Sequence, residues 1–474
     1  MAEPMWSGEK SRKIVERIVI EGTLVLETPA HFGDGDDEGA VMSLLVDSLD
    51  GTTPLLTGAS IAGALRSYLW AYERGYNVAQ KDGKNTATSL LFGTSRDDDR
   101  GDGDQSRLIV DDARAQTANI VYRDGIRLDE HSRTAAENAL YAVQLWDAGT
   151  IFPLRFELLI SEGDNRAKLL SGLLTALKGL ANGEITLGAR KRRGYGRVRV
   201  NEWHVRRYPV DTLNGLMAWL REGGSQLEDE HLVESLAAAF GETKQIDDKR
   251  QSVTLDAWFT LDGSLLIRST DDVTDMKHLA DSDGHPVLSG TSIAGALRAR
   301  ATKILNTLAP THSTKMVTSL FGSPHDQREN RTGSRITVEE RLIEGGNSEL
   351  VQSRVSIDRL TGGALDTALF NQQPLFGSAE EGVHIRLQLR NPADYEVGLL
   401  LLLLKDLWTG DLTLGGERSV GRGRLRGERA EITYQDRTWK LAANGNGLTI
   451  EPEHESLNTY LQSLLQKPEV SYGA

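Results

Sequence analysis

The sequence repeats itself at the length of a domain. GASIAGALR at residues 58–66 returns as GTSIAGALR at residues 290–298, with eight of nine positions identical at an offset of 232. Four further blocks recur in the same order, at offsets of 227 to 229. They pair SLLFGTS with TSLFGSP, SRLIVDD with SRITVEE, IRLDEHSRTAAENALY with VSIDRLTGGALDTALF, and LGARKRRGYGRVR with LGGERSVGRGRLR. The constant order predicts one duplicated domain of about 230 residues rather than a solenoid of short repeats.

This duplication predicts the domain organisation. A chain of 474 residues is too long for one ordinary hydrophobic core. We expect a first domain at residues 13–208, a helical linker at 209–249, a second domain at 250–434 and a C-terminal tail at 435–474. Apolar residues at helical spacing predict two helices in the linker and one amphipathic helical segment in the tail.

Each copy mixes strands and helices without regular βα alternation, so the predicted fold class is α+β. Alternating apolar residues predict strands at residues 18–28, 152–160, 252–269 and 383–389. Leucine-rich helices are expected at residues 166–181 and 397–408. The segments 123–146 and 352–376 are typical of surface hairpins.

Composition excludes several classes of protein. The chain has no cysteine, which rules out disulfides, thiolate zinc sites and cysteine nucleophiles and fits a reducing cytoplasm. No apolar run reaches the ~20 residues of a membrane span, and the first residues lack a signal-peptide pattern. The net charge of −14 argues against nucleic-acid binding when taken alone, so local charge has to decide that question.

The two Gly-Ser motifs each open a predicted helix. Backbone amides at such a turn, together with the helix dipole, suit a phosphate. The simpler interpretation is that Ser60 and Ser292 cap the helices while the neighbouring glycines allow close packing.

Basic residues are concentrated in two glycine-rich loops at matching positions of the repeat. GARKRRGYGRVR holds six basic residues within twelve, and Tyr195 between them could stack on a base. The second loop carries Arg418, Arg422, Arg424 and Arg426. Arginines beside glycines suit phosphate recognition, and the alternative is a solvated basic hairpin.

Asp47 and Asp281 precede the two Gly-Ser motifs in similar settings, VDSLDGTTPLLTG and ADSDGHPVLSG. Each aspartate is either a turn-forming residue or a catalytic one. The Asp34–Glu38 cluster lacks the spacing of an EF-hand and is expected to be a solvated loop.

The ordered motifs resemble the RAMP superfamily of CRISPR proteins, over about four fifths of the chain. VSIDRLTGGALDTALF is similar to the start of the thumb-like hairpin of type III backbone subunits, and Asp129 and Arg133 keep part of it in the first copy. The resemblance implies two tandem ferredoxin-like, RRM-related domains with thumb-like hairpin insertions. Two such domains in one chain are similar to the fused backbone proteins of type III-D and III-E systems.

The resemblance also implies a function. The chain would bind guide RNA, act with other CRISPR effector subunits, and cut complementary target RNA with a divalent metal, expected to be Mg²⁺. It implies that Asp47 and Asp281 are catalytic and metal-binding. It implies an RNA-binding set of Gly58, Ser60, Gly63, Arg66, Arg133, Arg190, Arg192, Arg193, Tyr195, Arg197, Gly290, Ser292, Gly295, Arg298, Arg359, Arg418, Arg422 and Arg424.

Two departures from the family pattern stand out. Ala62 and Ala294 occupy a position that often carries lysine, and the loop after Asp281 is two residues shorter than that after Asp47. Two other functions remain open. One is a non-cleaving backbone subunit, and the other is a guide-processing ribonuclease with His31 as general base.

Overall fold

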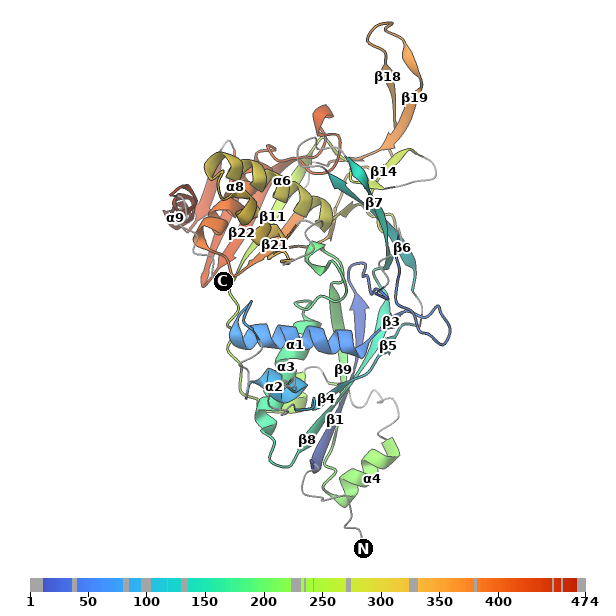
Figure 1. The fold of residues 1–474 in the computed structure, drawn as a ribbon, viewed down its shortest axis with the longest axis vertical. Helices are drawn as coiled ribbons and strands as arrows, with labels where there is room; N and C mark the ends of the chain where they lie inside the picture. Colours follow the sequence, from blue (N-terminus) through green and yellow to red (C-terminus); the bar gives the residue numbers. More distant parts are fainter. Residues whose placement is uncertain are drawn as a thin grey trace.

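The computed structural model describes residues 12–35, 41–79, 85–94, 104–116, 118–128, 135–222, 232–233, 236–241, 243–269, 274–323, 331–378, 382–445, 447–452 and 455–466. Two units lie one above the other along the long axis of the molecule (Figure 1), and each has its own large hydrophobic core. They follow the two copies of the repeat, so the duplication in the sequence is a duplication in space.

The first unit is built on an antiparallel sheet with the strand order β10-β9-β1-β8-β4. Its strands are β1 (Ile14–Leu26), β4 (Leu108–Val110), β8 (Ile151–Ser161), β9 (Val198–Tyr208) and β10 (Leu232–Val233). Alternate residues of β1 enter the core, as expected for a strand with one covered face. The helices α1 (Gly58–Arg74), α2 (Ala87–Phe92) and α3 (Arg166–Ala181) contribute buried leucines to the same core.

The second unit repeats this plan in the sheet β16-β21-β11-β22-β23-β24. Its strands are β11 (Ser252–Asp262), β16 (Ile336–Val338), β21 (Val383–Arg390), β22 (Arg424–Tyr434), β23 (Arg437–Asn444) and β24 (Gly447–Glu451). The helices are α6 (Gly290–Leu308), α7 (Ser313–Phe321), α8 (Asp394–Trp408) and α9 (Glu455–Leu465). The central strands β22-β11-β21-β16 correspond to β9-β1-β8-β4 of the first unit.

Each unit carries the predicted hairpin outside its main sheet. In the first unit, β6 (Ile120–Leu128) pairs with β7 (Ala135–Trp146), and β2 (Val41–Met42) joins β7. In the second, β18 (Gln352–Ile357) pairs with β19 (Ala364–Gln373), alongside β14 (Met276–His278) and β13 (Arg268–Ser269). The hairpin β18–β19 projects from one end of the molecule in Figure 1.

Three short strand pairs complete the two units. β3 (Leu55–Leu56) pairs with β5 (Ala113–Arg114), and β15 (Val287–Leu288) pairs with β17 (Arg341–Leu342). β12 (Ser264–Leu265) pairs with β20 (Leu375–Phe376). β3 and β15 lie directly before the two Gly-Ser helices, and their partners β5 and β17 come later in the chain.

The segments predicted as linker and tail contain the expected helices and also extend the two units. The segment 209–249 contains α4 (Leu213–Glu222) and α5 (Leu236–Phe240), but β10 extends the first sheet and α5 joins the first core. The segment 435–474 contributes β23 and β24 to the second sheet, and α9 packs against α8 through Leu457 and Leu464. Apolar faces in both segments are therefore buried by the units that they follow.

The content of mixed helices and antiparallel sheets agrees with the predicted α+β class. None of the helices in the described part of the chain combines the length and apolar character that a membrane crossing requires.

Candidate nucleic-acid interface

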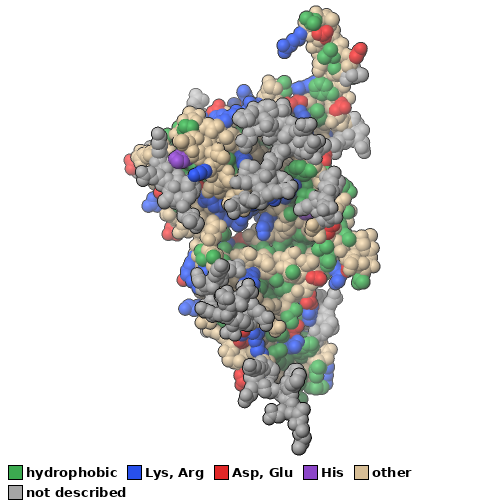
Figure 2. Space-filling view, in the orientation of Figure 1, with side chains coloured by type: hydrophobic (Ala, Val, Ile, Leu, Met, Phe, Trp, Pro, Cys, Tyr) green, Lys and Arg blue, Asp and Glu red, His purple; other side chains and the backbone are tan. Residues whose placement is uncertain are grey.

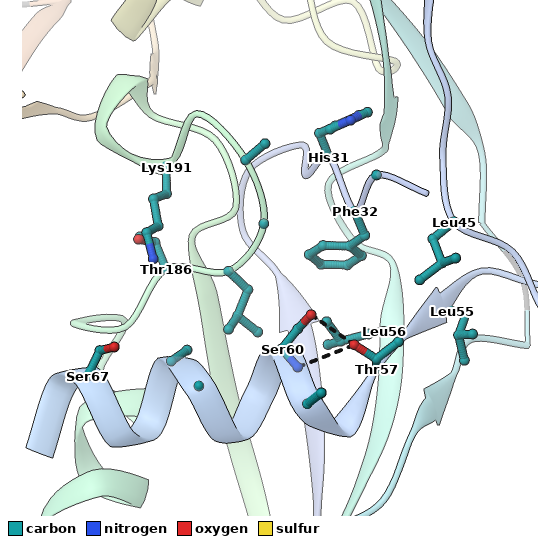
Figure 3. Close-up of a pocket in the computed structure, with 17 residues that line it drawn as sticks. His31, Phe32, Leu45, Leu55, Leu56, Thr57, Ser60, Ser67, Thr186 and Lys191 are labelled. Atoms are coloured by element: carbon teal, nitrogen blue, oxygen red, sulfur yellow. Dashed lines mark hydrogen bonds between the residues drawn. The ribbon is translucent and has the colours of Figure 1, made fainter. Parts of the chain in front are cut away.

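A cleft of about 490 Å³ separates the first Gly-Ser helix from the first glycine-rich loop. One wall is α1, with Thr57, Ser60, Gly63 and Ser67, and the opposite wall is formed by residues 186–191. Figure 3 shows Lys191 and Thr186 on the loop above the helix, with Phe32 at the other end. The fold thus brings together two motifs that lie more than a hundred residues apart in the sequence.

The N-cap position of each Gly-Ser helix is held by the residue directly before the motif. Thr57 is the N-cap of α1, and its hydroxyl oxygen accepts from the Ser60 amide at 3.3 Å. This corrects the interpretation of Ser60 as the cap, because Ser60 Oγ instead contacts Thr57 Oγ1 at 2.8 Å beside the cleft. In the second copy Ser289 holds the N-cap position without a side-chain cap bond, and Ser292 lies within the first turn.

The glycines of the two motifs have different roles. A Cβ added to Gly58 would come within 2.1 Å of the Val110 carbonyl oxygen, so this glycine is required by packing. The Gly58 amide donates to Asp112 Oδ1 at 2.7 Å, which leaves that amide engaged. Gly63 and Gly295 face open space, so their exposed helix surface is accessible to a ligand.

The first glycine-rich loop carries three cations that have no ion-pair partner in the described part of the chain. Lys191, Arg192 and Arg193 form the short helix η3 (Lys191–Arg193), and none of the three makes an ion pair within the described residues. Partial burial lowers the pKa of Lys191 and of Arg192, and Arg390 of the second copy lowers both further. Arg390 stacks on Tyr76 at 5.0 Å. These cations suit an anionic ligand because they lack a counter-charge of their own.

Other basic residues of this loop are engaged by the protein. Arg190 lies 4.5 Å from the ring centre of Tyr141 and donates to its hydroxyl at 2.9 Å. Arg197 bridges Glu27 and Glu339, each at 2.6 Å. Tyr195 is 4% exposed and packs with Val143 and Leu145, which corrects the expectation that it stacks on a base.

The loop also forms the seam between the two copies. A Cβ on Gly290, the first residue of α6, would come within 2.5 Å of the Arg193 carbonyl oxygen. A Cβ on Gly194 would come within 2.4 Å of the Glu340 backbone nitrogen. Across the same seam, Arg123 Nη2 lies 3.6 Å from Glu340 Oε1. The first basic loop therefore packs on the second Gly-Ser helix. Figure 2 shows Lys and Arg side chains along this seam between the two units.

The second glycine-rich loop is organised differently around η5 (Arg418–Val420). Arg422 is 2% exposed and donates to Glu417, Ser264, Gln352 and Gln372 at 2.8–3.0 Å. A fully enclosed guanidinium cannot reach a phosphate, so its predicted RNA contact is corrected to a structural role. Arg418 and Arg424 are exposed and remain available.

The remaining predicted RNA-binding arginines are scattered. Arg298 donates to the Gly322 carbonyl oxygen at 3.2 Å, and Arg66 has a buried Nε without a hydrogen-bond partner among the described residues. Arg359 is exposed at the tip of the hairpin β18–β19. Arg133 lies outside the described residues, as does Asp129.

Asp47 is held by an arginine. Its Oδ2 accepts from Arg114 Nε in a short charged contact, and its Oδ1 accepts from the Leu49 amide at 3.0 Å. The Leu49 amide and Arg114 together lower the pKa of the Asp47 carboxyl. The guanidinium occupies an oxygen that a metal would need, so Asp47 does not fit a cation site as it stands.

Asp281 has an imidazole beside it instead. Its Oδ2 lies 3.1 Å from His285 Nδ1, and its Oδ1 accepts from the amides of Asp283 and His285. Ligand atoms of Asp281, Asp283 and His285 all lie within 4.8 Å of one another. Carboxylate oxygens and an imidazole nitrogen are suitable ligands for a divalent cation, so these residues fit one.

His31 lines the cleft but is 3% exposed, and its Nδ1 lies 2.8 Å from the Gln144 carbonyl oxygen. This contact ties the imidazole to β7, away from the open face of α1. Its burial offers little support for the alternative in which His31 is the general base of guide processing.

Two residues of the site were missed from the sequence. Both lie outside the glycine-rich loops: Arg114 follows the repeated block SRLIVDD, and Arg390 follows the predicted strand 383–389. For Arg114 a signal existed, because the aligned repeat places Leu342 at the same position.

Comparison with known proteins gives one family. The sequence model of the RAMP superfamily matches residues 23–199 and again residues 258–426, which together are more than half of the chain. The curated proteins contain no significant match.

Proposed function

The chain belongs to the RAMP superfamily, a family of CRISPR-associated RNA-binding modules, and we propose that it is a guide-RNA-binding backbone subunit of a type III effector complex. The two matched regions make it a tandem two-domain RAMP protein. We assign each unit a ferredoxin-like core. The succession β1, α1, β4, β8, α3, β9 with the sheet order β9-β1-β8-β4 supports that assignment.

One observation carries the RNA-binding proposal. Lys191 lines the cleft along α1, and Arg192 and Arg390 lie close to it at the adjoining seam, where the Arg193 backbone contacts Gly290. None of these four cations has a carboxylate partner within the described residues. A phosphate backbone lying along α1 would supply the missing counter-charge, and the overall charge of −14 would not prevent this local attraction. The guide is thus proposed to cross from one copy to the other at this seam.

The cleavage proposal rests on the two aspartate loops, with Asp47 and Asp281 as candidates. RNA is cut when a 2′-hydroxyl oxygen attacks the adjacent phosphorus, loses its proton to a base, and the 5′-oxygen leaves with a proton. A carboxylate beside the target backbone can take the first proton. At the Asp281 loop, whose residues fit a cation, a bound divalent cation, proposed to be Mg²⁺, would neutralise charge at the phosphate. The hairpins β6–β7 and β18–β19 are proposed to hold the target strand open beside each loop.

The test uses the complex assembled on a guide, incubated with end-labelled complementary RNA with and without Mg²⁺. We expect co-purified RNA, and Mg²⁺-dependent products with 2′,3′-cyclic phosphate ends that D47A/D281A abolishes. A complex without RNA would refute the guide-binding proposal.

The second candidate function is a non-cleaving backbone subunit of the same complex. The Arg114–Asp47 contact favours it for the first copy, because a paired carboxylate is a poor base and a poor metal ligand. Intact target after incubation with Mg²⁺, in a complex that binds the guide normally, would select this alternative.

A further inference from the structure

The two aspartate loops are equivalent in the backbone. Val46 bridges Pro54 and Ala280 bridges Pro286, and the amide after each bridge donates back across the loop, from Asp47 to Thr53 and from Asp281 to His285. In both loops the aspartate Oδ1 accepts from the amide two residues later, at 3.0 Å. The two carboxylates therefore start from the same position in the fold.

The strand that pairs beside each loop carries a different residue at the position from which Arg114 reaches Asp47. Leu55 of β3 pairs with Arg114 of β5, and Val287 of β15 pairs with Leu342 of β17. Leu342 thus stands at the register position of Arg114, and it is 50% exposed. A leucine cannot neutralise a carboxylate, so this position of the second copy does not supply the charge that holds Asp47 in the first.

We infer that the residue at this register position decides which aspartate is available to a divalent cation: Arg114 closes the Asp47 loop, and Leu342 leaves the Asp281 loop open. If the chain cleaves RNA as proposed, the consequence is that the second copy makes the principal cut. Only this consequence rests on the proposed function. Arg114 and Leu342 act through the aspartates and are positioning residues.

The physical reason is competition for one carboxylate. A guanidinium bonded to Asp47 Oδ2 blocks that oxygen and adds a positive charge that repels a second cation. Beside Asp281 the neighbour is His285, whose imidazole can offer a nitrogen to a metal. In the shorter second loop His285 holds the register position that Thr53 holds in the first, so an imidazole stands there in this copy.

Reciprocal substitutions test the inference without RNA. The full chain is titrated with Mn²⁺, and bound ion is counted by electron paramagnetic resonance. We expect one site in the wild type, removed by D281N and unaffected by D47N. R114L should add a second site and R114K should not, while L342R should weaken the first site about tenfold or more. L342M is the matched apolar control and should bind as the wild type does.

Each outcome of this titration decides the inference. Two sites in the wild type, no site at all, or unchanged binding in L342R would overturn it. Circular dichroism of each variant separates loss of the site from loss of the fold, and R114K shows whether charge or shape is responsible.

Target cleavage by the assembled complex supplies the second readout. We expect a wild-type cut that D281A removes, and an additional cut in R114L that D47A removes again. Cleavage at both positions in the wild type, unchanged by R114L and L342R, would overturn the inference and leave the proposed function intact. No cleavage by any variant, with the expected Mn²⁺ pattern, would refute cleavage and leave the inference standing.

Discussion

The roots of the two hairpins show how a duplicated motif diverges while its backbone stays the same. In the first copy Tyr195 packs on Val143 of β7, and in the second Arg422 bonds to Gln372 of β19. Tyr195 aligns with Arg422 in the glycine-rich blocks, and Val143 aligns with Gln372 at the hairpin offset of 229. Between the two copies, an apolar contact is replaced by a polar one, and the loop residue and the hairpin residue have both changed. Because a buried polar group needs a partner, neither side could change alone.

The residue that opens each short helix has changed with it. Arg190 and Glu417 hold the same left-handed conformation, with φ of 53° and 59°. Arg190 stacks on Tyr141, whereas Glu417 pairs with Arg422 and Arg354. The second loop therefore uses Glu417 and Arg422 in internal pairs, and the first loop keeps three cations at the seam. Identical loop geometry supports a structural role in one copy and a proposed RNA contact in the other.

The largest expected effect comes from removing the buried guanidinium. R422M should lower the free energy of unfolding by about 3–5 kcal/mol, since it removes a buried cation that pairs with Glu417 and donates to Gln352 and Gln372. Urea unfolding followed by tryptophan fluorescence measures this loss. Y195F, the matched variant in the first copy, should change stability by less than about 1 kcal/mol. Equal losses of stability in the two variants would show that the buried Arg422 network contributes no more to folding than the apolar contact of Tyr195.

RNA affinity should separate the two loops next. K191A/R192A/R193A is expected to weaken guide binding about tenfold to a hundredfold and to reduce the salt slope by about 2, regardless of RNA sequence. The matched variant R418A/S419A/V420A removes one cation and should reduce the slope by about 0.7. Fluorescence anisotropy against salt concentration gives both numbers. A larger effect in the second loop would reverse the proposed division of roles.

The repeat, the two hairpins and both ends of helix α3 could be predicted from the sequence, because each shows as a pattern of residues along the chain. The sequence could not place the individual arginines, since exposure is decided by contacts across 50 or more residues, such as that of Arg422 with Gln372. Tyr195 and Arg422 both lie between glycines in basic loops, and only the packed hairpin shows that they are buried. The Asp47–Arg114 contact spans 67 residues and depends on the register of two short strands.

A smaller, pH-dependent effect is expected at the seam. Burial raises the pKa of Glu340 from 4.5 to about 7, against the opposing effect of Arg123. Between these pH values the folded state binds more protons than the unfolded state, so the free energy of unfolding falls as the pH rises from about 5 to about 7. We expect a fall on the order of 1–2 kcal/mol.

Urea unfolding of E340Q at pH 5 and pH 8 checks the source of this dependence. The variant has no titrating group at the position, so its stability should change less with pH than that of the wild type. A wild-type pH dependence in E340Q would assign the effect to another group. Asp112, the counterpart in the first copy, accepts from the Gly58 amide rather than from a cation of the other unit.

The smallest expected difference concerns the caps of the two Gly-Ser helices. Thr57 accepts from the Ser60 amide, whereas Ser289 has no such bond and its hydroxyl contacts Thr291 Oγ1 at 2.6 Å. T57A should therefore cost about 1 kcal/mol of unfolding free energy, and S289A less than about 0.5 kcal/mol. Equilibrium unfolding of both variants measures the difference. If S289A costs as much as T57A, the second helix is capped in solution as the first is, and the two motifs are closer in structure than their side chains indicate.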